Sequence, residues 1–470
     1  DSEKEIQACA ACHSRRAQLF DDPQDAGLLV ENYLLATLDQ GLYHPDGQIQ
    51  DEVFVHGSFL QSKMYQAGVT CSDCHNPHSL ELRVPGDGVC VQCHHADQYQ
   101  TPKHHFHSSV QGSACVDCHM PTTTYMEVDP RRDHSLRIPR PDLSVSLGVP
   151  NACNQCHSDE TPEWAAEHVE QWYGHVPQGA QQYAHTLAAG RAGSVGARQD
   201  LLKLLADEGQ PAVARATAAS LLQAWPGPEV AQSLFVALRA KDPVIRLGAL
   251  EAIGSYPPVT RWQLASPLLD APERVVRLQA AAQLLDIPPE QMQGDDIEKL
   301  RQAQQQYLKA QQANADDPSA QLNIGLYYQA RNQLALAEDA YARALELDPY
   351  FIGAYINLAD LYRASMRDPM AETLLNKGLE ALPEAAPLHF SLGLLKVRSK
   401  NMADALIELR RAVVLDPQNA HYRYVLAVAL DSADQRDAAL ALIAEGLDLT
   451  PANQTLLTLQ QQLQNKDATQ

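Results

Sequence analysis

The sequence predicts a mainly α-helical protein whose first 175 residues have little regular structure and whose remainder is an α-solenoid. Two observations carry this prediction. All ten cysteines lie before residue 157, and from about residue 185 onward the chain is rich in Ala, Leu and Gln with helical periodicity. Two repeat lengths then follow one another in this second part, which indicates stacked helix pairs. We expect three domains, at 1–175, 176–310 and 311–470.

The N-terminal segment is defined by one pattern, Cys-x-x-Cys-His, which occurs five times and uses every cysteine. The cysteine pairs are Cys9 and Cys12, Cys71 and Cys74, Cys90 and Cys93, Cys115 and Cys118, and Cys153 and Cys156. The histidines that follow them are His13, His75, His94, His119 and His157. This pattern is typical of covalent haem attachment, with two thiols for the porphyrin and a proximal histidine for the iron. The predicted cofactors are five haem c groups, so residues 1–175 form a multihaem cytochrome c module.

Three other uses of paired cysteines explain less of the pattern. Disulfides account for an even cysteine count in an exported chain, but not for a histidine at the same offset five times. Zinc sites built from two Cys-x-x-Cys units cannot be formed evenly from five units. A thioredoxin-like redox motif needs a surrounding strand and helix pattern, which this segment lacks.

The second axial ligand decides whether a haem iron only transfers electrons or also binds a substrate. Eight further histidines lie between residues 44 and 134, which is enough to fill every sixth position. The predicted distal ligands are His44, His78, His105, His107 and His134. The choice between His104 and His105 stays open. His56 and His95 are weaker candidates, which fit hydrogen bonding to propionates or an exposed position better.

The chain is acidic, with 36 basic and 58 acidic residues and a net charge of −22. This charge argues against a nucleic-acid partner. The one basic cluster in residues 1–175 comprises Arg131, Arg132, Arg137 and Arg140. It fits either neutralisation of haem propionates or guidance of an anionic substrate.

No apolar run is long enough to encode a membrane span. The polar start Asp1–Glu5 is expected for a mature terminus from which a signal peptide has been removed. The oligomeric state is not encoded in any recognisable pattern.

A 31-residue period marks the first part of the solenoid. Arginines recur as Arg215, Arg246 and Arg277, and alanines recur three residues after each of them. The stretch from Asp242 to Ala252, with a proline at its second position, resembles a HEAT-type repeat, in which proline starts a helix that stacks on its neighbours.

From about residue 318 the period becomes 34. The recurring prolines are Pro349, Pro383, Pro417 and Pro451; the recurring small residues are Gly325, Ala359, Gly393 and Ala427, and Ala337, Ala371, Ala405 and Ala439. This register resembles a tetratricopeptide (TPR) array, in which small residues allow two helices of a pair to approach. Such arrays usually bind partners along a groove.

The stretch from Val69 to Gly174 resembles bacterial multihaem c-type cytochromes fused to tetratricopeptide repeats. The motifs that carry this resemblance are Cys-His-Asn-Pro-His, Cys-His-Met-Pro, Arg-Arg-Asp-His-Ser and Pro-Asn-Ala-Cys. The module is also similar to the superfamily of tetrahaem carriers, pentahaem nitrite reductases and octahaem hydroxylamine oxidoreductases. The resemblance implies haem attachment after export, and therefore a periplasmic or extracellular location. The lysine-containing motif typical of the nitrite reductases is missing, so nitrite reduction is not implied.

The sequence thus predicts an electron-transfer protein in which the helical repeats dock a redox partner protein. An oxidoreductase that acts on a small nitrogen or sulfur compound at one five-coordinate haem is the alternative. A second alternative is an assembly scaffold in which the repeats are primary.

Overall fold

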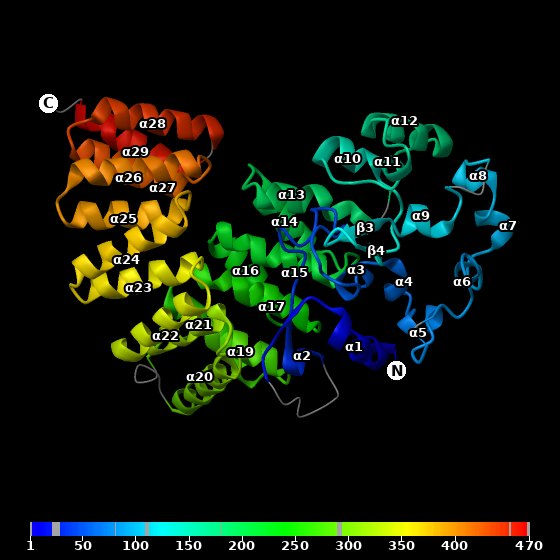
Figure 1. Cartoon of the computed structure of the whole chain (residues 1–470), viewed down its shortest axis with the longest axis horizontal. Helices are drawn as coiled ribbons and strands as arrows, with labels where there is room; N and C mark the ends of the chain where they lie inside the picture. Colours follow the sequence, from blue (N-terminus) through cyan, green and yellow to red (C-terminus); the bar gives the residue numbers. More distant parts are fainter. Residues whose placement is uncertain are drawn as a thin grey trace. The chain divides into compact units, whose positions relative to one another are not determined.

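The computed structural model describes residues 2–20, 29–79, 81–108, 112–178, 180–288, 294–450 and 453–467. The chain is mainly α-helical and divides into two compact units (Figure 1). Unit 1 comprises Asp1–Leu284 and Met292–Tyr307, and unit 2 comprises Leu285–Gln291 and Leu308–Gln470. The three predicted domain boundaries stay predictions.

The N-terminal part of unit 1 consists of short helices and two small hairpins. Its elements are α1 (Ser2–His13), β1 (Arg16–Gln18), α2 (Leu29–Asn32), β2 (Tyr33–Leu35), α3 (His56–Phe59), α4 (Lys63–Gln66), α5 (Cys71–Cys74), α6 (Gly88–Val91), α7 (Ala96–Tyr99), α8 (Pro102–His105), α9 (Cys115–His119), β3 (Thr122–Tyr125), β4 (Asp129–Arg132), α10 (Pro141–Leu147), α11 (Cys153–Cys156) and α12 (Pro162–Tyr173). Both hairpins are antiparallel, with Arg16 opposite Leu35 and Thr122 opposite Arg132.

The segment from Lys63 to Met120 builds no interior of its own. None of its described residues is buried, although the flanking Phe59 and Tyr125 are. An ordinary domain orders its backbone by burying apolar side chains, because each ordered residue costs about 1 to 2 kcal/mol of conformational entropy. The described residues of this segment are therefore exposed or only partly buried.

The remainder of unit 1 is a run of packed helices. These are η1 (Ala180–Tyr183), α13 (Ala184–Arg191), α14 (Ala197–Ala206), α15 (Ala212–Leu221), η2 (Leu222–Ala224), α16 (Pro228–Ala237), α17 (Pro243–Ala252), η3 (Ile253–Ser255), α18 (Pro258–Ala265), η4 (Ser266–Asp270), α19 (Arg274–Ala282) and α20 (Asp296–Ala313), of which the last continues into unit 2. The Asp242 side chain caps α17 by accepting from the Val244 N–H, and Pro243 is its first residue. A Cβ at Gly248 would overlap the carbonyl of Ala216, so glycine lets α17 and α15 approach.

The 31-residue period has a structural cause. The repeated alanines Ala218, Ala249 and Ala280 are fully buried. Arg215 donates to the Leu205 carbonyl at 3.0 Å, and Arg277 donates to the Pro272 carbonyl at 2.7 Å. Arg215 thus binds the last turn of α14, where carbonyl groups lack helical partners, and Arg277 binds the short loop between η4 and α19. Arg246 differs, because it pairs with Glu273 at 2.7 Å.

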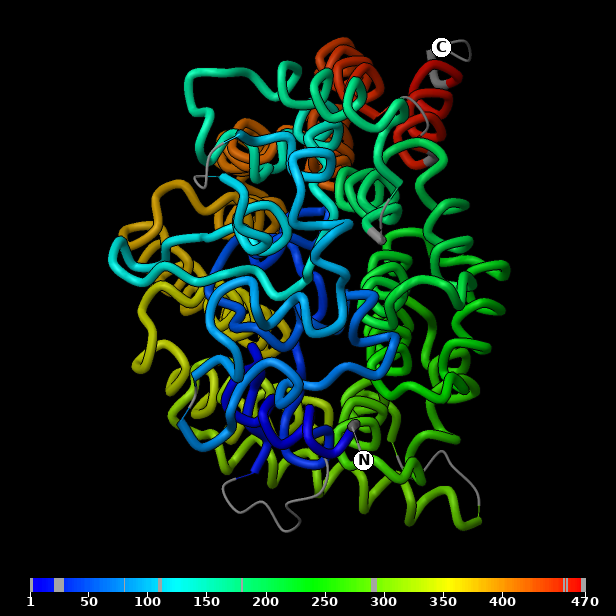
Figure 2. The backbone as a smooth tube through the Cα atoms, turned by 90° about the vertical axis from the view of Figure 1, so that its right-hand side faces the viewer, coloured from blue at the N-terminus to red at the C-terminus, as the bar shows by residue number. Residues whose placement is uncertain are grey.

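Unit 1 joins its N-terminal segment to these helices through buried polar contacts. Arg191 donates to the carbonyls of Tyr43 at 3.0 Å and Leu38 at 2.6 Å, and the Leu38 N–H donates to the Thr217 hydroxyl at 3.0 Å. The helices of α13 to α19 therefore support the segment that carries the cysteine motifs (Figure 2).

Unit 2 consists of helix pairs that repeat every 34 residues. The helices are α21 (Pro318–Gln329), α22 (Leu334–Leu347), α23 (Ile352–Ala364), α24 (Asp368–Ala381), α25 (Ala386–Arg398), α26 (Met402–Leu415), α27 (Ala420–Ser432), α28 (Arg436–Leu449) and α29 (Gln454–Asp467). The predicted small residues lie where the helices of a pair meet: Gly325 packs against Tyr341, and Gly393 packs against Leu409. The prediction of tetratricopeptide-type helix pairs is confirmed.

Two further features share the 34-residue register. The turn within each pair contains a residue of left-handed conformation, namely Asn332, Met366, Lys400 or Asp434. The side chains of Tyr355, His389 and Arg423 bind the carbonyls of Pro349, Pro383 and Pro417, respectively. Each proline carbonyl is therefore tied to the helix that follows it. Pro451 lies outside the described residues.

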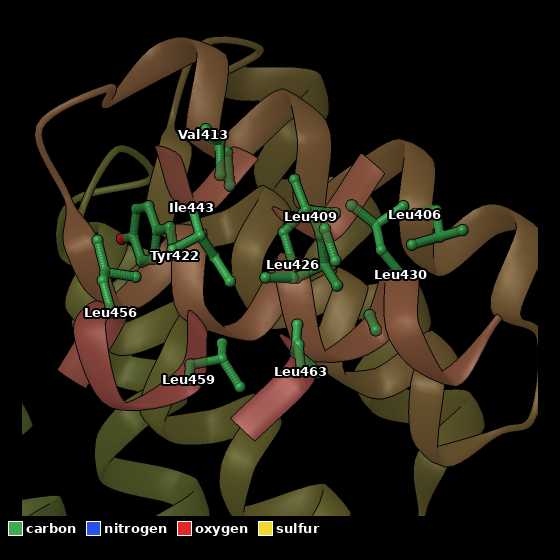
Figure 3. Packing of buried hydrophobic residues seen from close by; sticks show 14 of the residues in the cluster. Leu406, Leu409, Val413, Tyr422, Leu426, Leu430, Ile443, Leu456, Leu459 and Leu463 are labelled. Atoms are coloured by element: carbon green, nitrogen blue, oxygen red, sulfur yellow. The ribbon is translucent and has the colours of Figure 1, made fainter. Parts of the chain in front are cut away.

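The last helices of unit 2 enclose one apolar cluster (Figure 3). Leu409 of α26, Leu426 of α27 and Ile443 of α28 are buried together with Leu456 and Leu463 of α29. The helix α29 thus covers the end of the array with one apolar face. Within the part of the chain that the structure describes, no helix has both the length and the apolar character needed to cross a bilayer.

Candidate functional site

The five cysteine motifs lie on short helical turns. Cys71–Cys74 is α5, Cys153–Cys156 is α11, and the first and fourth motifs lie on α1 and α9. In the third motif Cys90 lies on α6, and Cys93 follows the end of that helix. One helical turn brings residues i and i+3 to the same side. In three motifs the histidine N–H also donates to the carbonyl of the first cysteine: His75 to Cys71 at 2.9 Å, His94 to Cys90 at 3.0 Å, and His157 to Cys153 at 2.9 Å. Each turn therefore presents two thiols and a histidine in a compact unit.

All ten thiols are free, and none is fully buried. Among the described residues, the one group of three or more metal-binding side chains within mutual reach consists of Asp87, Cys90 and Cys115. A structural zinc site needs four ligands in a tetrahedron. Among the described residues, no group of cysteines and histidines has the four ligands of such a site.

Three motif histidines each face a second histidine from a distant part of the chain. The ring centroids are 6.4 Å apart for His75 and His134, 6.0 Å for His119 and His104, and 6.2 Å for His157 and His107. The interplanar angles are 27°, 13° and 34°, respectively. A metal–imidazole bond of about 2 Å on each side, plus about 1 Å from each nitrogen to its ring centroid, gives a separation of roughly 6 Å. The three pairs therefore have the spacing of two axial ligands.

The hydrogen bonds of these rings fix which nitrogen is free. The Nδ1 atoms of His119, His134 and His107 lie 2.7, 2.9 and 2.5 Å from the carbonyl oxygens of Arg137, Arg132 and His105. A carbonyl only accepts, so each Nδ1 carries the proton and Nε2 keeps its lone pair. Histidines that bind metals commonly have such a partner on their other nitrogen.

Burial also favours the neutral form of the facing rings. Desolvation lowers the pKa of His134, and it lowers the pKa of His104, where the neighbouring His119 acts in the same direction. Only the neutral imidazole can bind a metal ion. The residues present thus fit axial ligation at these three sites.

The other candidate histidines are not in a pair with a motif histidine. His44 is half-buried beside Asp46, and burial lowers its pKa. His78 is exposed, and its N–H donates to Asn76 Oδ1 at 3.0 Å. The ring of His105 lies 6.4 Å from that of His107. Desolvation lowers the pKa of the buried His56 to about 4.

The choice between His104 and His105 was open from the sequence, and in the structure His104 is the one that lies against a motif histidine. The ring that faces His119 is that of His104, on α8, and not that of His105. Three aromatic contacts were also not foreseen. Tyr99 lies against both His94 and His104, with centroid distances of 5.7 and 5.2 Å. Trp164 of α12 lies 4.9 Å from His157.

The four arginines of the basic cluster are paired with carboxylates of the chain. Arg131 binds Glu52 and Asp129, Arg132 binds Asp117, Arg137 binds Asp46 and Asp133, and Arg140 binds Asp142. Arg137 and its two partners are buried. Its contact with Asp46 Oδ2, at 3.0 Å, holds the loop after β4 against the segment after His44. Arg137 therefore stabilises the contact between these two parts of the chain.

Comparisons with known proteins concern the helical repeats. A tetratricopeptide repeat family model matches residues 318–351. The chain is 26% identical over 179 residues to human protein O-mannosyl-transferase TMTC3, covering 35% of this chain and 20% of that protein. It is 26% identical over 147 residues to anaphase-promoting complex subunit CDC16 of Saccharomyces cerevisiae, covering 30% of this chain and 18% of that protein. The chain thus spans about a fifth of the length of these relatives.

Solved structures of repeat proteins are also similar. A thermophilic TPR protein of Thermus thermophilus has 21% identity and a TM-score of 0.30, and covers 36% of this chain and 91% of its own. MamA of Desulfovibrio magneticus has 18% identity and a TM-score of 0.28, and covers 37% of this chain and 97% of its own. The family match and the 34-residue helix pairs show that the chain contains tetratricopeptide repeats, which typically bind protein partners.

Proposed function

We propose that this chain is an exported pentahaem c-type cytochrome that transfers electrons, and that its helical repeats dock the protein with which it exchanges them. The observation that carries the proposal is the set of three facing histidine pairs. In each pair, one ring directly follows a Cys-x-x-Cys turn and the other comes from a separate segment. Bound haem iron would supply a one-electron couple, with no protein side chain consumed.

The chain's own residues would hold and orient the five haems. The ten cysteines would bind the porphyrin edges, and the five motif histidines would be the proximal ligands. His134, His104 and His107 would be the second histidine ligands at the second, fourth and fifth motifs. Two of the three remaining sequence-predicted ligands, His44, His78 and His105, complete the set. Two imidazole ligands leave no open position on an iron, which favours electron transfer over catalysis.

The porphyrins would also account for the segment from Lys63 to Met120. None of its described residues is fully buried, and three haems attached between Cys71 and Cys118 would supply an apolar interior. This proposal accounts for the free thiols of the same segment. It also places the protein in the periplasm or outside the cell, where haem is attached to such motifs in the cytochromes that it resembles.

The pairing of His104 with His119 gives a direct test. Replacing His104 by alanine is expected to remove the sixth ligand of the fourth iron, so that one of five ferric irons becomes high-spin and binds carbon monoxide after reduction. Low-temperature EPR of the oxidised protein and optical spectra with and without carbon monoxide measure both effects.

His185→Ala is the matched control, because His185 is an exposed histidine on α13 that is not part of any cysteine motif. It should keep all irons low-spin. If His104→Ala also keeps five low-spin irons at full haem content, the assignment of His104 is wrong.

A further inference from the structure

The first and second cysteine motifs are joined by one acidic side chain. Glu5, one turn before Cys9 on α1, accepts from the N–H of Ser72 at 2.7 Å and from its hydroxyl at 2.9 Å. Ser72 lies inside the second motif. Burial raises the pKa of the Cys71 thiol, and the neighbouring Cys9 thiol acts in the same direction. The two attachment turns are therefore neighbours, although about sixty residues separate them in the sequence.

The second and third motifs follow each other closely in the chain. The chain between them folds back onto the second motif. The backbone N–H of Arg83 donates to the Cys74 carbonyl at 2.8 Å, and the Arg83 side chain donates to the Ser72 carbonyl. The thiol of Cys74 lies close enough to those of Cys90 and Cys93 to interact with them electrostatically.

The third and fourth motifs touch through Asp87. Its Oδ1 accepts from the Cys115 N–H at 3.0 Å, and the ligand atoms of Asp87, Cys90 and Cys115 all lie within 4.8 Å of one another. Tyr99 gives a second link between these sites, since its ring contacts both His94 and His104. His94 follows the third motif, and His104 faces the histidine of the fourth.

The fourth and fifth motifs share three links. Gln155, inside the fifth motif, donates to the Thr122 carbonyl at 3.0 Å, three residues after His119. His104 and His107, which face the histidines of the fourth and fifth motifs, stand three residues apart on one segment. The Cys118 thiol also interacts electrostatically with those of Cys153 and Cys156.

The direct contacts of the motif turns join motifs that are consecutive in the sequence. The second and fourth motifs are not in direct contact among the described residues, and share only the segment in which His134 faces His75 and the Arg137 carbonyl accepts from His119. In Figure 1, α1, α5, α6, α9 and α11 follow one another along unit 1. We propose that the five haem sites form one unbranched line in the order of their motifs, with the Cys9 site and the Cys153 site as its two ends. This inference rests on the proposed function.

In such a line, electrons pass through the five sites in the order of the motifs. An electron that enters at one end meets each of the five sites before it leaves at the other, and the middle site, at Cys90 and Cys93, is crossed on every passage. The exchange partner then docks beside an end site.

The positions of the irons test this order. Crystals of the whole haem-loaded chain, measured at the iron absorption edge, give the five iron positions, and the thioether bonds in the electron density identify the motif that holds each. The expected result is that the nearest neighbours of each iron are those of the preceding and following motifs. An iron of the first motif that lies nearest to that of the fourth or fifth would overturn the line.

Failure of the proposed function is a different outcome. A chain purified from a host with haem-attachment machinery that carries no covalent haem, shown by its mass, would contradict the cytochrome and leave no irons to order. A chain with five haems in another arrangement would contradict the line alone.

Discussion

Without attached haem, the segment from Lys63 to Met120 is expected to be unfolded and to be cleaved rapidly by proteases, while the tetratricopeptide repeats stay intact. The segment has no buried side chain among its described residues. It therefore has nothing with which to offset the conformational entropy of ordering its backbone. Unit 2 keeps its own apolar clusters, which need no cofactor.

Limited proteolysis measures this difference. The same chain is produced with and without haem-attachment machinery, and cleavage sites are mapped by mass spectrometry. We expect cleavage within residues 63–120 to be at least about tenfold faster without haem, since open segments are cut according to their unfolded population. The internal control is the helix pair α25 and α26, whose rate of cleavage should not change. Equal protection of residues 63–120 in both preparations would contradict the proposed role of the porphyrins.

Replacing Arg137 by alanine is expected to destabilise unit 1 by about 3 to 5 kcal/mol, because it leaves the buried carboxylates of Asp46 and Asp133 without a counter-charge. The guanidinium also joins the loop after β4 to the segment after His44. Urea unfolding of the haem-loaded protein, followed by circular dichroism, measures the loss.

Two variants make this test specific. Arg198→Ala breaks an exposed pair with Glu229 in the same unit and should cost about 1 kcal/mol or less. The triple variant Arg137→Met, Asp46→Asn and Asp133→Asn buries no net charge and should recover part of the loss. If Arg137→Ala and Arg198→Ala have the same stability, the buried charge network is not what holds this loop.

Much of the fold follows from local sequence signals. The 34-residue register of Pro349, Pro383 and Pro417 places helix ends, and small residues such as Gly325 and Gly393 place helix contacts, because both act on their immediate neighbours. The left-handed turn at Asn332 was not predicted. Asparagine tolerates this conformation without requiring it, and the residues at the equivalent positions of the next repeats are Met366, Lys400 and Asp434.

Local sequence signals likewise predict one part of the candidate site and not the other. The cysteine turns are visible in the sequence because two thiols and a histidine within five residues have few other uses. His107 and His134 were predicted as ligands, but the motif histidine that each one faces was not, because His75 and His134 meet through the fold of a segment without regular structure. The choice of His104 over His105 depends on which side of the short helix α8 faces His119. No local pattern records that orientation.

The buried contact of Arg137 with Asp46 shows why the basic cluster was ambiguous. The two residues are 91 positions apart, so neither neutralisation of propionates nor binding of an anion could be decided from charge alone. The positions of the arginines in the sequence do not reveal which carboxylates the fold brings next to them.

The central claim is that this chain holds five haems with two histidine ligands on each iron. Low-temperature EPR of the oxidised whole protein, with the iron content determined on the same sample, tests it most directly. The account predicts low-spin ferric signals that integrate to five irons per chain. A chain without haem iron, or one in which high-spin ferric iron predominates, would contradict it.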